Sequence, residues 1–143
     1  MKKFILFLTA ILFSLTAFAH GPTPQKVQES ITVAISPDKA YAILKDFPEF
    51  KKFMKTRSAD DDLKKIKYAL LKEEGPFTDY NAYIIVNKGL NDNESVIQWT
   101  ARFYRVYKLN PPIPEGQDDA TAKAAVQKIV EKGLADLKKA LSN

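Results

Sequence analysis

The sequence predicts an α+β protein in which an antiparallel sheet packs on one long C-terminal helix. The segment Val96–Tyr107 alternates large apolar and polar side chains, which is typical of a strand with one buried face. Apolar residues at helical spacing follow Asp118 and Asp119, either of which can cap the helix. Because the strand and the helix each have one apolar face, the simplest arrangement lays the helix across the sheet.

The N-terminus has the pattern of a cleavable signal peptide. Lys2 and Lys3 precede the apolar run Phe4–Leu15, and Ala17–Ala19 has the small-x-small form of a cleavage site. The run is shorter than the roughly 20 apolar residues that span a bilayer. We therefore interpret residues 1–19 as a signal peptide and expect no stable membrane insertion after cleavage.

Cleavage would leave residues 20–143, which is enough chain for one domain with a core of its own. The loss of two lysines would lower the formal net charge from +5 to about +3. The remaining basic residues are scattered rather than gathered with aromatic residues, so nothing favours nucleic acid as a partner. The chain has no cysteine, so its stability must come from packing rather than from disulfides.

The rest of the chain predicts about four strands with two helical segments after the first. Ser36-Pro37-Asp38 is a typical helix start, and Phe50–Met54 suggests a second, short helical turn. The polar segment Arg57–Asp62 is interpreted as a solvated loop or a helix start, because a calcium loop needs ligands at alternate positions and a turn glycine. The expected strands are Val27–Ile35, Lys65–Lys72, Thr78–Asn87 and Val96–Tyr107.

No group of residues composes a catalytic site or a cofactor site. The single histidine, His20, precludes a serine-histidine-aspartate triad, and there is no glycine-rich phosphate loop. After cleavage the α-amine and imidazole of His20 can together chelate Cu(II), but no other histidine or cysteine exists to complete a site. A mobile terminus is the simpler interpretation. The sequence thus predicts no metal, no cofactor and no enzyme.

Two groups of side chains are candidates for binding. The aromatic residues of the expected buried faces either fill an ordinary core or line an apolar cavity between sheet and helix: Tyr68, Tyr80, Trp99, Phe103 and Tyr107. The basic residues near the proline-rich bend after the last strand are either solvated strand ends or the rim of a docking surface: Arg102, Arg105 and Lys108.

The order of elements resembles the helix-grip fold of the SRPBCC superfamily, which includes START domains and polyketide cyclases. Residues 36–47 resemble the segment that follows the first strand in that superfamily. Residues 19–27 and 103–112, with the final helix from Asp118, are similar to the MxaD family of exported accessory proteins. That family usually has a tryptophan-histidine pair at the cavity mouth where this chain has Phe53-Met54. It also has more strands before Lys65, so we expect a shortened sheet with a reduced or open cavity.

The resemblance implies a periplasmic, non-enzymatic protein that supports methanol oxidation by contacting methanol dehydrogenase or its cytochrome c partner. A mildly basic surface suits an acidic partner. The alternative is a carrier or binder of a lipid or other apolar small molecule in a cavity between sheet and helix. A third hypothesis from the resemblance is that the protein is an enzyme of the cyclase type.

Overall fold

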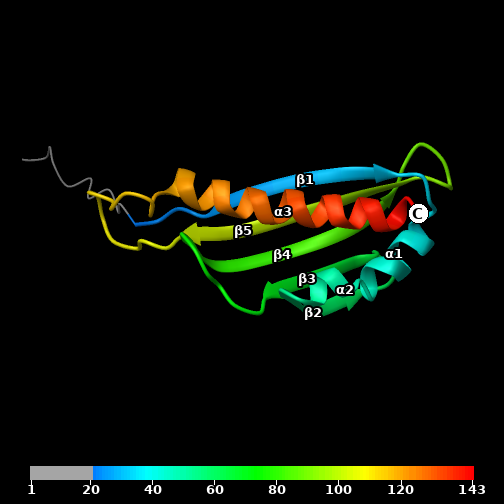
Figure 1. The fold of residues 1–143 in the computed structure, drawn as a ribbon, viewed down its shortest axis with the longest axis horizontal. Helices are drawn as coiled ribbons and strands as arrows, with labels where there is room; N and C mark the ends of the chain where they lie inside the picture. Colours follow the sequence, from blue (N-terminus) through cyan, green and yellow to red (C-terminus); the bar gives the residue numbers. More distant parts are fainter. Residues whose placement is uncertain (1–20) are drawn as a thin grey trace, which may run out of the picture.

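The computed structural model describes residues 21–143, so the expected signal peptide and His20 lie outside the described residues. Five strands form one antiparallel sheet in the order β1-β5-β4-β3-β2 (Figure 1). The strands are β1 (Gln25–Val33), β2 (Met54–Asp60), β3 (Lys65–Leu70), β4 (Phe77–Lys88) and β5 (Ser95–Arg105). The helices are α1 (Pro37–Lys45), α2 (Pro48–Lys51) and α3 (Asp119–Leu141).

The core lies between α3 and one face of the sheet. Figure 1 shows α3 running along the sheet, where it contacts β1, β5 and β4. The short helix α1 contacts β4, and the short helix α2 contacts β2, near the β2 edge of the sheet. The fully buried large side chains include Trp99, Phe103 and Ile97 from β5 and Val126, Val130 and Leu137 from α3.

The predicted fold class is confirmed, and so is the start of the long helix. Asp118 is the N-cap of α3, and its carboxylate accepts a hydrogen bond from the backbone amide of Thr121 at 2.7 Å. This bond satisfies one of the free amides of the first turn. Hydrogen bonding by the side chain of Thr121, and then by its backbone amide, lowers the pKa of Asp118 below its ordinary value. Ser36 also precedes a helix, but its side chain makes no capping bond to α1.

The number of strands differs from the prediction of about four. The structure pairs Met54–Asp60 with β3 as β2, in the region where Arg57–Asp62 was interpreted as a solvated loop or a helix start. Only Met54 of this strand is buried, so the alternation that reveals a strand is lacking. The strand also contains a bulge between Thr56 and Ser58, which is common at sheet edges.

Within residues 21–143, no helix is long and apolar enough to cross a membrane.

Candidate functional site

A pocket of about 340 Å³ opens between α3 and the end of the sheet where β3 leads into β4. Its walls come from three parts of the chain that are far apart in sequence. The lining residues are Phe53, Leu70, Lys72, Glu74, Phe77, Ile129, Lys132, Gly133 and Asp136. The walls are therefore mainly apolar, while the charged side chains belong to the segment after β3 and to α3.

Local structure holds the walls in place. Phe53 lies between α2 and β2, and its carbonyl accepts a hydrogen bond from the amide of Leu71 at 2.9 Å, which ties the start of β2 to the end of β3. Phe77 begins β4 and packs edge-on against Phe103. Ile129 and Gly133 are four residues apart on α3, so they present adjacent positions to the pocket.

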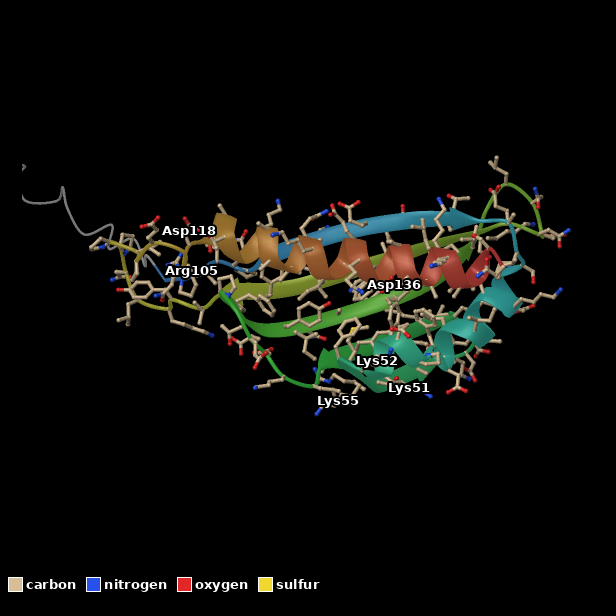
Figure 2. The ribbon with its side chains drawn as sticks, in the orientation of Figure 1. Lys51, Lys52, Lys55, Arg105, Asp118 and Asp136 are labelled. Atoms are coloured by element: carbon tan, nitrogen blue, oxygen red, sulfur yellow. The ribbon has the colours of Figure 1, made fainter. Side chains whose placement is uncertain are left out.

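The charges at the pocket are paired with one another. Lys132 Nζ lies 2.8 Å from an oxygen of Asp136, and Lys72 forms an ion pair with Glu74. The bond to Asp136 raises the pKa of Lys132. Figure 2 shows Asp136 on α3, above the part of the molecule that contains α2. With both cations neutralised in this way, the pocket offers apolar contact without a net charge.

The wall that α3 contributes rests directly on Trp99 of β5. A Cβ built on Gly133 would lie 2.8 Å from Cη2 of Trp99 and 3.5 Å from a ring carbon of Phe50, so the indole fills the space that a side chain would take. The indole Nε1–H donates a hydrogen bond to the hydroxyl of Tyr80 at 3.1 Å. Burial raises the pKa of both Tyr80 and Tyr68.

Of the two interpretations of the aromatic residues, ordinary core and cavity lining, the structure places most of them in the core. Tyr68, Tyr80, Trp99 and Phe103 are buried, and none of them lines the pocket beside α3. Tyr107 lies beyond the end of β5 and is half-buried. Trp99 lies directly behind the pocket wall, because its indole packs against Gly133.

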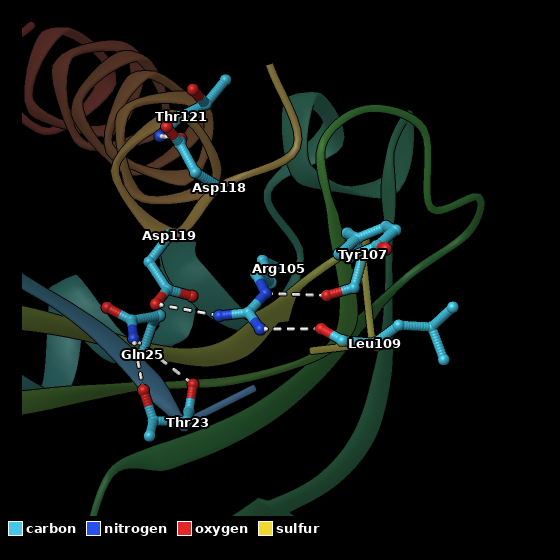
Figure 3. A network of polar contacts seen from close by, with 8 residues as sticks. All are labelled: Thr23, Gln25, Arg105, Tyr107, Leu109, Asp118, Asp119 and Thr121. Atoms are coloured by element: carbon cyan, nitrogen blue, oxygen red, sulfur yellow. Dashed lines mark hydrogen bonds and ion pairs between the residues drawn. The ribbon is translucent and has the colours of Figure 1, made fainter. Parts of the chain in front are cut away.

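Arg105 was a candidate for a solvated strand end or for the rim of a docking surface, and the structure contradicts the exposure that both interpretations require. Its side chain is 6% exposed and projects from the inner face of β5. The guanidinium donates to the carbonyl oxygens of Tyr107 at 2.7 Å and Leu109 at 3.3 Å, and it lies 3.4 Å from a carboxylate oxygen of Asp119 (Figure 3). Arg105 therefore ties the bend after β5 to the first turn of α3.

Arg102 and Lys108, the other two residues of the predicted rim, are exposed. Lys108 forms an ion pair with Asp79, and its Nζ lies 5.3 Å from the centre of the Tyr104 ring. Arg102 projects from the outer face of β5, on the opposite side of the sheet from Arg105. The three residues thus do not form one surface.

The pocket residues that sequence reasoning missed are Leu70, Phe77 and Ile129, with the charged residues around them. One signal could have identified part of the pocket, because a glycine inside a helix, Gly133, often marks a close approach to a neighbouring element. Phe53 lies at the pocket, as the family resemblance implied for this position, whereas Met54 is buried in the core. Among residues 21–143, no group of three or more histidine, cysteine, aspartate or glutamate side chains could hold a metal ion.

Several solved structures share this arrangement at low sequence identity. An uncharacterized protein of Bacillus thuringiensis superposes with a TM-score of 0.65 at 17% identity, over 82% of this chain and 98% of that one. The Zhui aromatase/cyclase of a Streptomyces species superposes with a TM-score of 0.58 at 15% identity, over 83% and 92%. The two-domain aromatase/cyclase BexL gives 0.57 at 12% identity, over 82% of this chain and 45% of that one. No protein-family model and no curated protein sequence matches the chain.

These neighbours correct the prediction that the protein is not an enzyme. That prediction relied on the lack of a triad and of a cofactor motif, yet aromatase/cyclases are built on the same fold. An enzymatic role is thus open, though it is not established, because fold alone does not define function. The comparisons give no support to the MxaD family or to methanol oxidation. What they do show is that this chain has a helix-grip-like fold, the fold of these aromatase/cyclases.

Proposed function

We propose that the protein binds an apolar small molecule in the pocket between α3 and the turn from β3 to β4. The observation that carries this proposal is the pocket itself, whose volume of about 340 Å³ lies within the range of ligand sites. Its apolar wall is formed by Phe53, Leu70, Phe77 and Ile129. Transfer of a ligand onto such a wall gains roughly 25 cal/mol for each Å² of apolar surface removed from water.

The charge arrangement favours a neutral ligand over an anion or a cation. Lys132 is paired with Asp136, and Lys72 is paired with Glu74, so neither lysine needs a ligand carboxylate. A charged ligand would have to lose hydration without gaining an unpaired partner at the rim. The expected ligand class is therefore a lipid-like or polycyclic molecule with few polar groups.

The test is a titration of the protein with a neutral naphthylamine fluorescent probe, N-phenyl-1-naphthylamine. The variant Ile129→Trp places an indole in the pocket and is expected to weaken probe binding at least tenfold. Ala124→Trp adds the same side chain at an exposed position of α3 and serves as the matched control. Equal probe affinity in the two variants, with both folded by circular dichroism, would rule out this pocket as the site.

The sequence resemblance to MxaD supports a second proposal, that the protein is exported to the periplasm and contacts methanol dehydrogenase or its cytochrome c acceptor. Its support is the phrases at residues 19–27 and 103–112. Terminal sequencing of the protein from its host is expected to begin at His20, and immobilised mature protein is expected to retain purified methanol dehydrogenase. An uncut N-terminus, or no retention at low salt, contradicts this proposal and leaves the pocket proposal untouched.

A further inference from the structure

The outer face of the sheet carries a second depression, on the side that α3 does not cover. Its volume is about 260 Å³, and it lies across the middle of β3, β4 and β5. The strand register places Lys67, Tyr83 and Thr100 in one row across these three strands. The complete lining is Lys65, Lys67, Asn81, Ala82, Tyr83, Thr100 and Arg102.

This depression is positively charged and contains no carboxylate. Lys65, Lys67 and Arg102 all line it, and none of the three forms an ion pair with another residue of the described chain. Lys26 of β1 adds a fourth positive charge, because it lies directly opposite Arg102 in the antiparallel register. Like charges at directly opposed positions destabilise a sheet. An anion placed among them would relieve this repulsion.

A buried hydroxyl group at the same place lacks a partner. Thr100 is 2% exposed, and its Oγ1 makes no hydrogen bond within residues 21–143. A buried hydroxyl without a partner costs free energy, since it has lost its hydrogen bonds to water. Thr100 lines the depression, so a group bound there would lie beside the residue that carries this unpaired hydroxyl.

Tyr83 and Asn81 position the basic side chains around the depression. Lys65 Nζ lies 4.1 Å from the centre of the Tyr83 ring, which holds the ammonium over the aromatic face. Asn81 lies opposite Arg102 in the register between β4 and β5, so the side-chain amide and the guanidinium start from neighbouring positions in the depression. Cationic and neutral donors thus surround one space from several sides.

We propose that this depression binds the oxyanion group, a phosphate or a carboxylate, of a small molecule. The Arg102 guanidinium would form paired charge-assisted hydrogen bonds with two oxygens of the group. The hydroxyl of Thr100 and the amide of Asn81 donate to the same group, while Lys67 and Lys26 supply the surrounding positive potential. This site is separate from the apolar pocket, because the two lie on opposite faces of the sheet.

The first test is a titration of the full mature chain with inorganic phosphate, followed by NMR shifts of backbone amides. A parallel titration with acetate at equal ionic strength distinguishes the two sources of the oxyanion, and sodium chloride controls for salt screening. We expect one of the two anions to shift the amides of β3, β4 and β5 around Thr100 saturably, well beyond chloride. Shifts no larger than those of chloride, or shifts spread over the whole surface, overturn the proposal.

The second test separates a built site from a diffuse basic surface. Arg102→Gln is expected to weaken binding of the preferred anion at least tenfold, whereas Lys123→Gln, which removes one charge from exposed α3, changes it less than twofold. Thr100→Val removes the unpaired hydroxyl, so it is expected to raise the melting temperature and yet weaken anion binding several-fold. Equal effects of the two charge variants, or full anion affinity in Thr100→Val, overturn the proposal.

Discussion

Trp99 of β5 and Gly133 of α3 are in such close contact that no other residue type fits the helix position without movement. A Cβ on Gly133 would lie 2.8 Å from Cη2 of the indole and closer still to Cζ3, which is shorter than real side chains tolerate. Trp99 has no exposed surface, so the indole cannot move toward solvent. This contact sets how closely α3 approaches the sheet and, with it, the depth of the apolar pocket.

Gly133→Ala is expected to destabilise the protein although alanine is the better helix former. The alanine would gain about 1 kcal/mol of helix propensity, but overpacking against the indole costs roughly 1–3 kcal/mol. We expect a net loss of up to about 2 kcal/mol in the free energy of unfolding, measured by urea denaturation. Ala135→Gly, at an exposed position of the same helix, measures the propensity contribution by itself. A Gly133→Ala protein more stable than the wild type contradicts the contact.

Tyr80→Phe is expected to cost roughly 1–3 kcal/mol, because the indole Nε1–H of Trp99 would lose its only acceptor within the described chain while remaining buried. Thermal unfolding measures the loss. The control is Tyr83→Phe, which removes a hydroxyl on the outer face of β4 that makes no hydrogen bond to residues 21–143; its effect is expected to stay within about 0.5 kcal/mol. Similar melting temperatures for the two variants would show that the Tyr80 bond contributes nothing.

Arg105→Ala is expected to destabilise the fold rather than to affect a docking surface. The change leaves the carbonyl oxygens of Tyr107 and Leu109 without their donor and removes the partner of Asp119. We expect a loss of roughly 1–3 kcal/mol, measured by urea denaturation, since Asp119 is partly exposed and regains water. Arg102→Ala removes the same side chain from the outer face and should change stability by no more than about 0.5 kcal/mol. If Arg105→Ala were as stable as Arg102→Ala, the tie between the bend and α3 would be unimportant.

Stability is expected to fall as the pH rises above 10. Burial, together with a 2.8 Å hydrogen bond to Asp61, raises the pKa of Tyr41 from 10.0 to about 12. Burial also raises the pKa of Tyr68 and Tyr80. Between pH 10 and 12 the unfolded chain therefore loses tyrosine protons that the folded protein retains, so unfolding becomes more favourable.

The measurement is the urea midpoint across this pH range, together with the ultraviolet absorbance of the phenolate. Tyr41→Phe is expected to make the decline in stability less steep, because one of the retained protons is absent. A midpoint that stays constant from pH 10 to 12, or a Tyr41→Phe protein with an unchanged slope, contradicts the raised pKa.

Patterns within a continuous stretch of chain determined most of the layout. The alternation of β4 and β5, the Asp118 cap and the apolar stripe of α3 each arise from neighbours in sequence, and all three appear in the structure. Such patterns are reliable because the periods of strand and helix follow from backbone geometry alone. They were sufficient to predict an α+β fold with the long helix on the sheet.

Tertiary structure alone decided three features. The segment Met54–Asp60 became β2 because β3 supplies its hydrogen-bond partners, while the side chains after Met54 stay in water and carry no alternation. Arg105 entered the inner face because Asp119, 14 residues away, and two backbone carbonyls compensate its charge. The apolar pocket joins residues of β3, β4, α3 and the start of β2, and the basic depression joins three strands. No local pattern encodes such sites, because their volume depends on how closely the elements pack, and here the contact of Trp99 with Gly133 sets that distance.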